Sequence, residues 1–525
     1  MRRYGLAADT IRLSVFSFLM RAVGLLYSVW LTNAVGIRTL GLTQLVSVAY
    51  GFCATLSCAG LRLAATQLST RAIAHKKSPV SVLRFCVCFG FLWGCTVAAG
   101  LFFLSPQIAA SLLNEANLAP ALRCVSLALP FLAMTSALYG YYTAKGRILL
   151  LSFLQGLEQL FQIIIVSLLL SRQVRPGSFQ TAFALMVSVV AAEAFSFGLA
   201  CLFLPKNFSK EKENTEPPSA AAFFRIVLPS GVSSVACSLL RSAQEVLIPT
   251  ALVAWGLTRV DAVSLYGTVN GVVYPVLFFP AAILTSLSIV IVPALTRAYV
   301  CGNRRRILSL TRRLLRLTIS FSLGCCVFLF SFSDAISLCL FSDASYGSAL
   351  VLFSPLIPLA YLDLIVDSIL RSIDKQIWAT VCAVADAGLS LLLIQILVPA
   401  FGVAGLAASV LSAKLLNLSL SLLRLESGLS VGLKPVRFIF LPFLFALLCA
   451  RACSVIPAVA FPATAVLLVK GVCFCASYCA CLLLVRPGED REEDAKNKRL
   501  QNGRHRAEHN KNKTKKTILF YGDRL

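Results

Sequence analysis

The chain has 525 residues, of which 58% are hydrophobic and only 14% are charged, and its formal net charge is +25. Soluble domains carry about 25% charged residues, so the composition excludes an ordinary soluble protein and predicts an all-α polytopic membrane protein. A charge of this sign would suit nucleic acid or anionic lipid. Because the basic residues follow the predicted membrane loops, no nucleic-acid partner is expected.

About 14 apolar spans can be read along the chain. The first has no small-residue cleavage site and is followed by many others, so we read it as a retained helix and not as a signal peptide. With the N-terminus inside, most Lys and Arg residues fall in cytoplasmic loops, and the opposite loops receive little beyond Arg38, Arg172, Arg175 and Arg259. The positive-inside rule then places both termini in the cytoplasm.

Nineteen cysteines lie mostly inside apolar spans, where cysteine acts as a small packing residue. The spacing CxCxxxxxxC from Cys86 to Cys95 has no histidine beside it. We therefore expect no metal site and no cofactor.

Arg21 lies inside the first apolar run, Ile11 to Gly36. It belongs to a stripe of polar and small residues at helical spacing, which comprises Thr10, Ser14, Ser17, Arg21, Gly24 and Ser28. An intramembrane arginine usually faces a protein interior or a watery cavity, although one this near the helix start could also snorkel to the interface. Both interpretations stay open from the sequence.

Other spans of the first half carry polar residues too. The second, about Leu42 to Ala65, has a stripe that runs from Gln44 to Arg62. The fifth has Glu158 within a patch of glutamines, and the sixth has Glu193. These positions are candidates for substrate or ion contacts.

Residues 205–222 are predicted as a cytoplasmic linker, because the stretch PKNFSKEKENTEPP is charged and bears prolines. The linker separates an N-terminal lobe (residues 1–204) from a C-terminal lobe (residues 223–424). Two further helices are expected in residues 425–485, and a disordered basic cytoplasmic tail in residues 486–525.

The second half looks like a repeat of the first. Arg241 matches Arg21 when Gly256 is aligned with Gly36, and Glu158 matches Asp386 at the same offset as Pro130 and Pro358. Both copies begin on the cytoplasmic side, so the two lobes should be related by an axis along the membrane normal.

Further polar residues mark the spans of the second half. The seventh span has Glu245 one turn after Arg241, and the eighth has Asn270 followed by Pro275 and Pro280. The later spans carry Asp363, Asp367, Asp386 and Lys414. The carboxylates are candidates for coupling to Na⁺ or H⁺, and the alternative is that Glu245 pairs with Arg241 and that Asp363 and Asp367 pair with basic neighbours.

Three stretches resemble one known family. GIRTLGLTQLVSVAYGFCATLSCAGLRLAATQLSTRA (residues 36–72), PFLAMTSALYGYYTAKGR (residues 130–147) and GVVYPVLFFPAAILTSLSIVIVPALTRAYVCGNRRRI (residues 271–307) are similar to the stage V sporulation protein B type of flippase. That family belongs with the MurJ-type lipid II flippases and polysaccharide exporters, in the superfamily that also holds the MATE drug exporters. The resemblance covers about residues 11–484.

The resemblance implies two six-helix lobes around a central cavity and two C-terminal helices that add a groove for a lipid tail. It also implies a monomeric protein of the bacterial cytoplasmic membrane, with membrane lipids around it. One departure is Arg62, because the family tends to have a neutral kink with proline where this chain has a charge.

The function expected from these features is flipping of a polyprenyl-pyrophosphate-linked saccharide, for cell wall, spore cortex or surface polysaccharide. Arg21, Arg62 and Arg241, with Gln44 and Asn270, could bind the headgroup, because arginine contacts phosphate oxygens in a bidentate manner. The alternative is a MATE-type multidrug antiporter coupled to a cation, which would use the carboxylates. An enzyme is not expected, since no external loop exceeds about seventeen residues.

Overall fold

The computed structural model describes residues 2–75, 78–173, 179–204, 219–429, 439–455 and 463–485. Within these ranges eleven helices are long and apolar enough to span a membrane, and a bent pair of shorter helices makes a twelfth. This confirms the all-α polytopic fold, while the number fourteen stays a prediction. Two compact units are present, residues 1–434 and residues 435–525. The predicted linker up to residue 218 and the tail lie outside the described residues.

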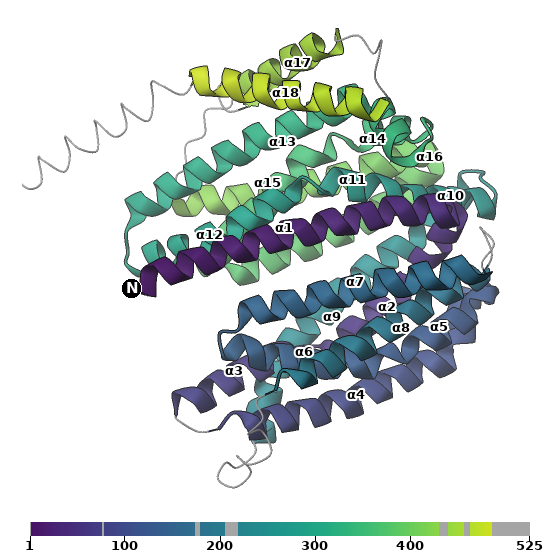
Figure 1. Cartoon of the computed structure of the whole chain (residues 1–525), viewed down its shortest axis with the longest axis vertical. Coiled ribbons are helices and arrows are strands. Elements are labelled where there is room, and N and C mark those ends of the chain that lie inside the picture. Colours follow the sequence, from purple (N-terminus) through teal and green to yellow (C-terminus); the bar gives the residue numbers. More distant parts are fainter. Residues whose placement is uncertain are drawn as a thin grey trace, which may run out of the picture. The chain divides into compact units, whose positions relative to one another are not determined.

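The first half of unit one is drawn in purple to blue in Figure 1. Its helices are α1 (Arg2–Val35), α2 (Ile37–Cys58), α3 (Leu61–Ala74), α4 (Val80–Gln107), η1 (Ile108–Leu112), η2 (Ala116–Leu118), α5 (Ala119–Ser126), α6 (Ala128–Ala144), α7 (Ile148–Gln173) and α8 (Phe179–Leu202). The second predicted span is broken into α2 and α3, because Gly60 adopts a φ of 69° between them. Only Gly36 separates α1 from α2.

Residues 37–43, at the junction of the first two apolar spans of the sequence, form the first two turns of α2 and not an external turn. Thr43 donates its hydroxyl to the Thr39 carbonyl at 2.8 Å, so its polar group is satisfied within the helix. Gly41 faces the Val263 carbonyl so closely that a Cβ would lie 2.2 Å from that oxygen. Close packing against another helix therefore buries a stretch that reads as polar.

The second half comprises α9 (Ala220–Ala254), α10 (Arg259–Thr268), η4 (Val269–Val273), α11 (Tyr274–Phe278), α12 (Ala281–Val300), α13 (Arg304–Phe341), α14 (Tyr346–Phe353), α15 (Leu356–Ser372) and α16 (Gln376–Leu429). The predicted eighth span is interrupted, as its prolines indicate: η4 holds Asn270, and a break at Phe279 and Pro280 precedes α12. A proline removes one helical hydrogen bond and displaces the carbonyl four residues earlier.

The same proline effect bends both halves at equivalent places. α5 and α6 are separated at Leu127, three residues before Pro130. α14 and α15 meet at an angle of 49°, at Ser354 and Pro355, just before Pro358. The bends are thus related by the sequence offset that relates the prolines, which supports the internal repeat.

α16 is a helical hairpin and not one straight rod. Gly402, near its middle, has φ 58° and ψ −128°. Lys414 contacts Asp386 although 28 residues separate them, a distance of about 42 Å in a straight helix. Lys375 likewise donates to the Arg424 carbonyl across 49 residues. The two arms, residues 376–401 and 403–429, therefore run antiparallel.

The halves contact one another through their first helices. α1 packs against α12 of the second half and α7 of the first, as Figure 1 shows, and α9 packs against α2 and α3 of the first half and α16 of the second. α2 also crosses α10 closely, since a Cβ on Gly267 would lie 2.5 Å from the Ile37 carbonyl oxygen. Small residues at such crossings are typical of membrane helix packing.

Within each half the helices also pack in the same order. α4 against α6 corresponds to α13 against α15, and the α7–α8 pair corresponds to the arms of α16. In unit two, α17 (Leu441–Ser454) packs against α18 (Ala463–Val485). α18 is long enough to span a membrane, whereas α17 has only 14 residues.

Candidate functional site

The polar stripe of α1 faces protein and not lipid. Ser14 and Ser286 of α12 each donate a hydroxyl to the other's carbonyl, at 3.4 and 3.3 Å. Ser28 donates to the Gly271 carbonyl of η4 at 3.0 Å. Arg21 lies seven residues from each of these serines, so it shares the face that α1 turns to the second half.

Arg21 itself is exposed, and it has no hydrogen-bond or ion-pair partner among the described residues. Its neighbours on the chain pack against α7: Gln159 donates to the Met20 carbonyl at 3.5 Å and lies against Gly24. The guanidinium therefore lies on a helix held between the two halves, without a counter-ion of its own.

Arg241 has the corresponding place on α9. Ser238, three residues earlier, donates to Thr55 of α2 at 3.2 Å, so this face of α9 turns to the first half. Gln244 donates to Ser390 of α16 at 2.8 Å. Arg241 is exposed, and within the described ranges it makes no hydrogen bond or ion pair.

The expected pairing of Glu245 with Arg241 is not seen as an ion pair within 4.0 Å, although the guanidinium is close enough to act on the carboxylate electrostatically. Glu245 instead accepts a hydrogen bond at 2.8 Å from the Tyr266 hydroxyl of α10. The tyrosine comes from a different helix, so only the packing of α9 on α10 brings it to the carboxylate. Arg241 is therefore left without an ion pair although an acid lies one turn away.

Arg62 of α3 joins a cluster in the first half. Its guanidinium lies over the Tyr139 ring, 5.8 Å from the centroid, a contact that attracts a cation to the ring face. The Tyr139 hydroxyl lies 3.0 Å from the Ser196 hydroxyl, and Ser196 donates to Glu158 at 2.7 Å. The helices α3, α6, α7 and α8 thus meet at this point.

Glu193 lies one turn before Ser196 on α8. Its carboxylate accepts a hydrogen bond from the Tyr50 hydroxyl of α2 at 3.3 Å. Glu158 and Glu193 are both half-buried, and neither has a Lys or Arg nitrogen within 4.0 Å in the described part of the chain. We name Tyr50, Tyr139, Glu158, Glu193 and Ser196 the first-half cluster.

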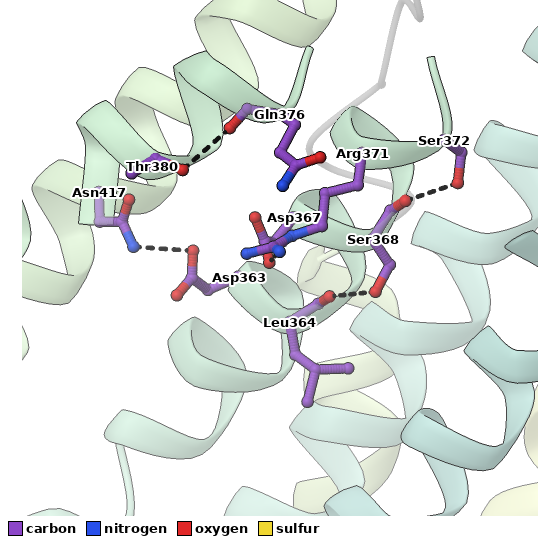
Figure 2. A network of polar contacts seen from close by, with 9 residues as sticks. All are labelled: Asp363, Leu364, Asp367, Ser368, Arg371, Ser372, Gln376, Thr380 and Asn417. Atoms are coloured by element: carbon purple, nitrogen blue, oxygen red, sulfur yellow. Dashed lines mark hydrogen bonds and ion pairs between the residues drawn. The ribbon is translucent and has the colours of Figure 1, made fainter. Parts of the chain in front are cut away.

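The second half brings two acids and a lysine together. Lys414 donates to Asp386 at 2.6 Å and to Asp363 at 3.3 Å. Asn417 donates its amide to Asp363 at 2.9 Å, and Figure 2 shows this second bond of Asp363. The three charged side chains are 15 to 28% exposed. We name Asp363, Asp386, Lys414 and Asn417 the second-half cluster.

Asp367 lies one turn after Asp363 but points to a different partner. Arg371 of the same helix donates to it at 2.9 Å, and Figure 2 shows the two side chains next to each other. This pair is 38 and 54% exposed, so it is a solvated pair of the type that contributes little. The expectation that Asp363 and Asp367 pair with basic residues is confirmed, since each has such a partner.

Two predicted residues have no side-chain partner within the described residues. The amide nitrogen of Asn270 is buried without a hydrogen bond, in the π-helical turn η4. Gln44 is half-buried on α2 and makes no side-chain hydrogen bond within the described part of the chain. A cavity of about 610 Å³ opens elsewhere, between α3 and α9, and is lined by Arg71, Arg225 and small or apolar residues of α9.

Sequence reasoning missed the side chains that complete the clusters: Tyr50, Tyr139, Ser196, Tyr266 and Asn417. Lys414 was noticed but not joined to Asp386. One signal was available, because Lys414 and Asn417 lie three residues apart in an apolar span, as Glu193 and Ser196 do. Two polar residues at this spacing share a helix face.

Comparisons with known proteins agree with this fold. Residues 6–299 match the family described as "Polysaccharide biosynthesis protein". "Stage V sporulation protein B" of Bacillus subtilis (strain 168) is 23% identical over 440 residues, which make up 81% of this chain and 84% of that protein.

Two solved structures share the architecture. "Lipid II flippase MurJ, inward closed conformation" has a TM-score of 0.67 at 13% identity, covering 90% of this chain and 98% of the other. "Outward-facing conformation of a multidrug resistance MATE family transporter of the MOP superfamily" has a TM-score of 0.58 at 12% identity, covering 80% and 95%. Since the family match spans more than half of the sequence, the chain belongs to the polysaccharide biosynthesis protein family, with the fold of the MOP superfamily's transporters.

Proposed function

We propose that this protein carries a polyprenyl-pyrophosphate-linked saccharide across the bacterial cytoplasmic membrane by alternating access. The family is described by polysaccharide biosynthesis, and one protein of the same fold is named a lipid II flippase. The precursor would serve cell wall, spore cortex or surface polysaccharide, and the name of the Bacillus subtilis relative favours a sporulation role. No chemical step is needed, so the protein is a transporter and not an enzyme.

The observation that carries this proposal is the matched placement of Arg21 and Arg241. Both are exposed on membrane helices that pack between the two halves, and neither has an ion-pair partner among the described residues. A charge at this depth is costly unless water or a ligand meets it. A pyrophosphate offers the oxygens that a guanidinium binds in a bidentate manner.

Arg62, Gln44 and Asn270 would complete the headgroup site in this proposal. Asn270 supports it, because its buried amide nitrogen has no hydrogen-bond partner in the described structure and an unmade bond of that kind costs about 1–3 kcal/mol. Arg62 would link the headgroup to the first-half cluster through Tyr139.

Alternating access needs two bodies that can rock against each other. We infer that these are the lobes of residues 1–204 and 223–424, with α1 and α9 as the helices that cross between them. The repeated order of helix contacts in the two halves supports this division. Both termini would be cytoplasmic, and the protein would work as a monomer among membrane lipids.

The experiment is complementation of a strain that lacks its lipid-linked saccharide flippase. Arg21→Lys, Arg241→Lys and both alanine variants are compared at equal membrane abundance. If the arginines bind pyrophosphate, the lysine substitutions impair growth because lysine lacks the planar, bidentate guanidinium, and the alanine substitutions impair it more. Lysine would be nearly silent for a snorkelling residue, and full activity of both alanine variants would reject the headgroup role.

A MATE-type cation-coupled drug antiporter is the second candidate, favoured by the first-half cluster. Glu158 and Glu193 have no Lys or Arg within ion-pair distance in the described residues. A site for H⁺ or Na⁺ would require carboxylates of this kind, which no basic side chain neutralises. Asp367 is less suited, since its carboxylate already pairs with Arg371. Drug resistance in a pump-deficient strain, abolished by Glu193→Gln, would favour this candidate over flipping.

A further inference from the structure

The ammonium group of Lys414 is the counter-ion of two carboxylates. Its ammonium contacts Asp386 at 2.6 Å and Asp363 at 3.3 Å. The two acids come from different elements, Asp363 from α15 and Asp386 from the first arm of α16. Because Lys414 lies on the second arm, the hairpin at Gly402 sets the ammonium between them. The formal charge of the two carboxylates and the ammonium together is −1, and it would be −2 without the lysine.

The first half has a related arrangement without a lysine. Glu158 corresponds to Asp386, and Glu193 with Ser196 repeats the three-residue spacing of Lys414 with Asn417. In each half a helix donates to an acid of the helix before it. Ser196 of α8 donates to Glu158 of α7 at 2.7 Å, and Lys414 of the second arm of α16 donates to Asp386 of the first arm at 2.6 Å. By that spacing Lys414 matches Glu193 and Asn417 matches Ser196, so the two donors are not equivalent positions. The halves share an acid that accepts a bond from the following helix, and in the second half the donor is an ammonium.

We propose that the second-half cluster is a site for a monovalent cation that the Lys414 ammonium occupies permanently. Na⁺, K⁺ and an alkylammonium carry the same single charge, and carboxylate and amide oxygens are suitable ligands for hard cations. While Lys414 is present, this half exchanges no cation with solution. The inference extends the proposed transport function to its coupling, but the occupancy itself does not depend on what is transported.

A purely structural ion pair would make a different prediction from an occupied cation site. In both cases removal of the lysine leaves two half-buried carboxylates and destabilises the fold. Only an oxygen-lined site with room for a cation would then take one up from solution. Gain of cation binding is therefore the decisive measurement, and loss of stability alone is not.

The experiment uses the purified full-length protein in detergent. Its Tm is followed while NaCl, KCl or ethylammonium chloride replaces choline chloride at constant ionic strength. The variants are wild type, Lys414→Ala and Lys414→Ala combined with Asp386→Asn. We expect a saturable rise of Tm in Lys414→Ala, at cation concentrations about tenfold or more below any effect in the other two. A Lys414→Ala protein that responds to these cations as wild type does overturns the proposal.

If the alanine variant does not accumulate, the wild-type protein can still overturn the proposal. The proposal predicts that Asp386→Asn leaves the Na⁺ response of the wild-type chain unchanged, because the lysine already fills the site. A saturable stabilisation by Na⁺ that Asp386→Asn abolishes would show an exchangeable ion beside the lysine, and it would overturn the proposal. No lipid substrate enters either arm, so failure here is distinct from failure of the complementation test.

Discussion

Lys414 lies 2.6 Å from Asp386, across 28 residues of sequence. The contact is made because α16 reverses direction at Gly402, so that residues on its two arms face each other at the same depth. The reversal turns one long apolar stretch, residues 376–427, into two antiparallel helices. It also sets a charged residue of each arm against the neighbouring helix α15.

Gly402→Ala should disrupt this hairpin. The residue has φ 58° and ψ −128°, a region that only glycine adopts readily, and a Cβ would lie 2.6 Å from the Trp255 ring. We expect a loss of about 2 kcal/mol or more in unfolding free energy, measured by thermal denaturation in detergent. Gly388→Ala is the matched control, because it lies in the same helix with nothing within 4 Å of its Cβ; equal losses in both variants would contradict the hairpin geometry.

The two ion pairs of α15 should differ in their contribution to stability. Lys414→Ala leaves two half-buried carboxylates without their cation and should cost about 3–5 kcal/mol. Arg371→Ala breaks the exposed pair with Asp367, 54 and 38% exposed, and should cost less than about 1 kcal/mol. Urea or thermal unfolding of the two variants against wild type measures the difference.

A double variant separates the two contributions further. Lys414→Met combined with Asp386→Leu removes one charge of each sign and should recover much of the loss, because apolar pairs can replace a buried ion pair. A Lys414→Ala protein as stable as Arg371→Ala would show that the second-half cluster is solvated and contributes no more than a surface pair.

Reporter fusions test the orientation in the membrane. The distribution of basic loops predicts that fusions after residues 77 and 218 read as cytoplasmic and that one after Asn117 reads as external. Asn117 lies in η2, between α4 and α5, so its side of the membrane fixes the direction of both. A cytoplasmic signal at Asn117 would contradict the predicted topology.

The sequence was sufficient for features that depend on local chemistry. Hydropathy indicated a helical protein with many membrane spans, and Pro130 and Pro358 indicated helix breaks, because a missing N–H acts on the helix that contains it. The offset that relates Glu158 to Asp386 also predicted which helices would correspond. Each of these signals lies within one helix or one repeat.

Features that depend on which helices meet could not be predicted. Tyr266 reaches Glu245 only because α10 packs on α9. The sequence of neither helix indicates that the other is its packing partner. The burial of residues 37–43 at the start of α2 could not be predicted for the same reason, because the sequence shows neither the bond from the Thr43 hydroxyl to the Thr39 carbonyl nor the crossing with α10.

The central claim is that Arg21 and Arg241 bind the pyrophosphate of the carried lipid, and direct binding tests it best. Native mass spectrometry or a competition assay compares undecaprenyl pyrophosphate with the monophosphate and with undecaprenol, on wild type and on Arg21→Ala and Arg241→Ala. We predict the order pyrophosphate, monophosphate, alcohol for wild type, and a loss of about tenfold or more in pyrophosphate affinity for each variant, with the alcohol unchanged. Equal affinity of wild type for all three lipids, or unchanged pyrophosphate affinity in both variants, would contradict the account.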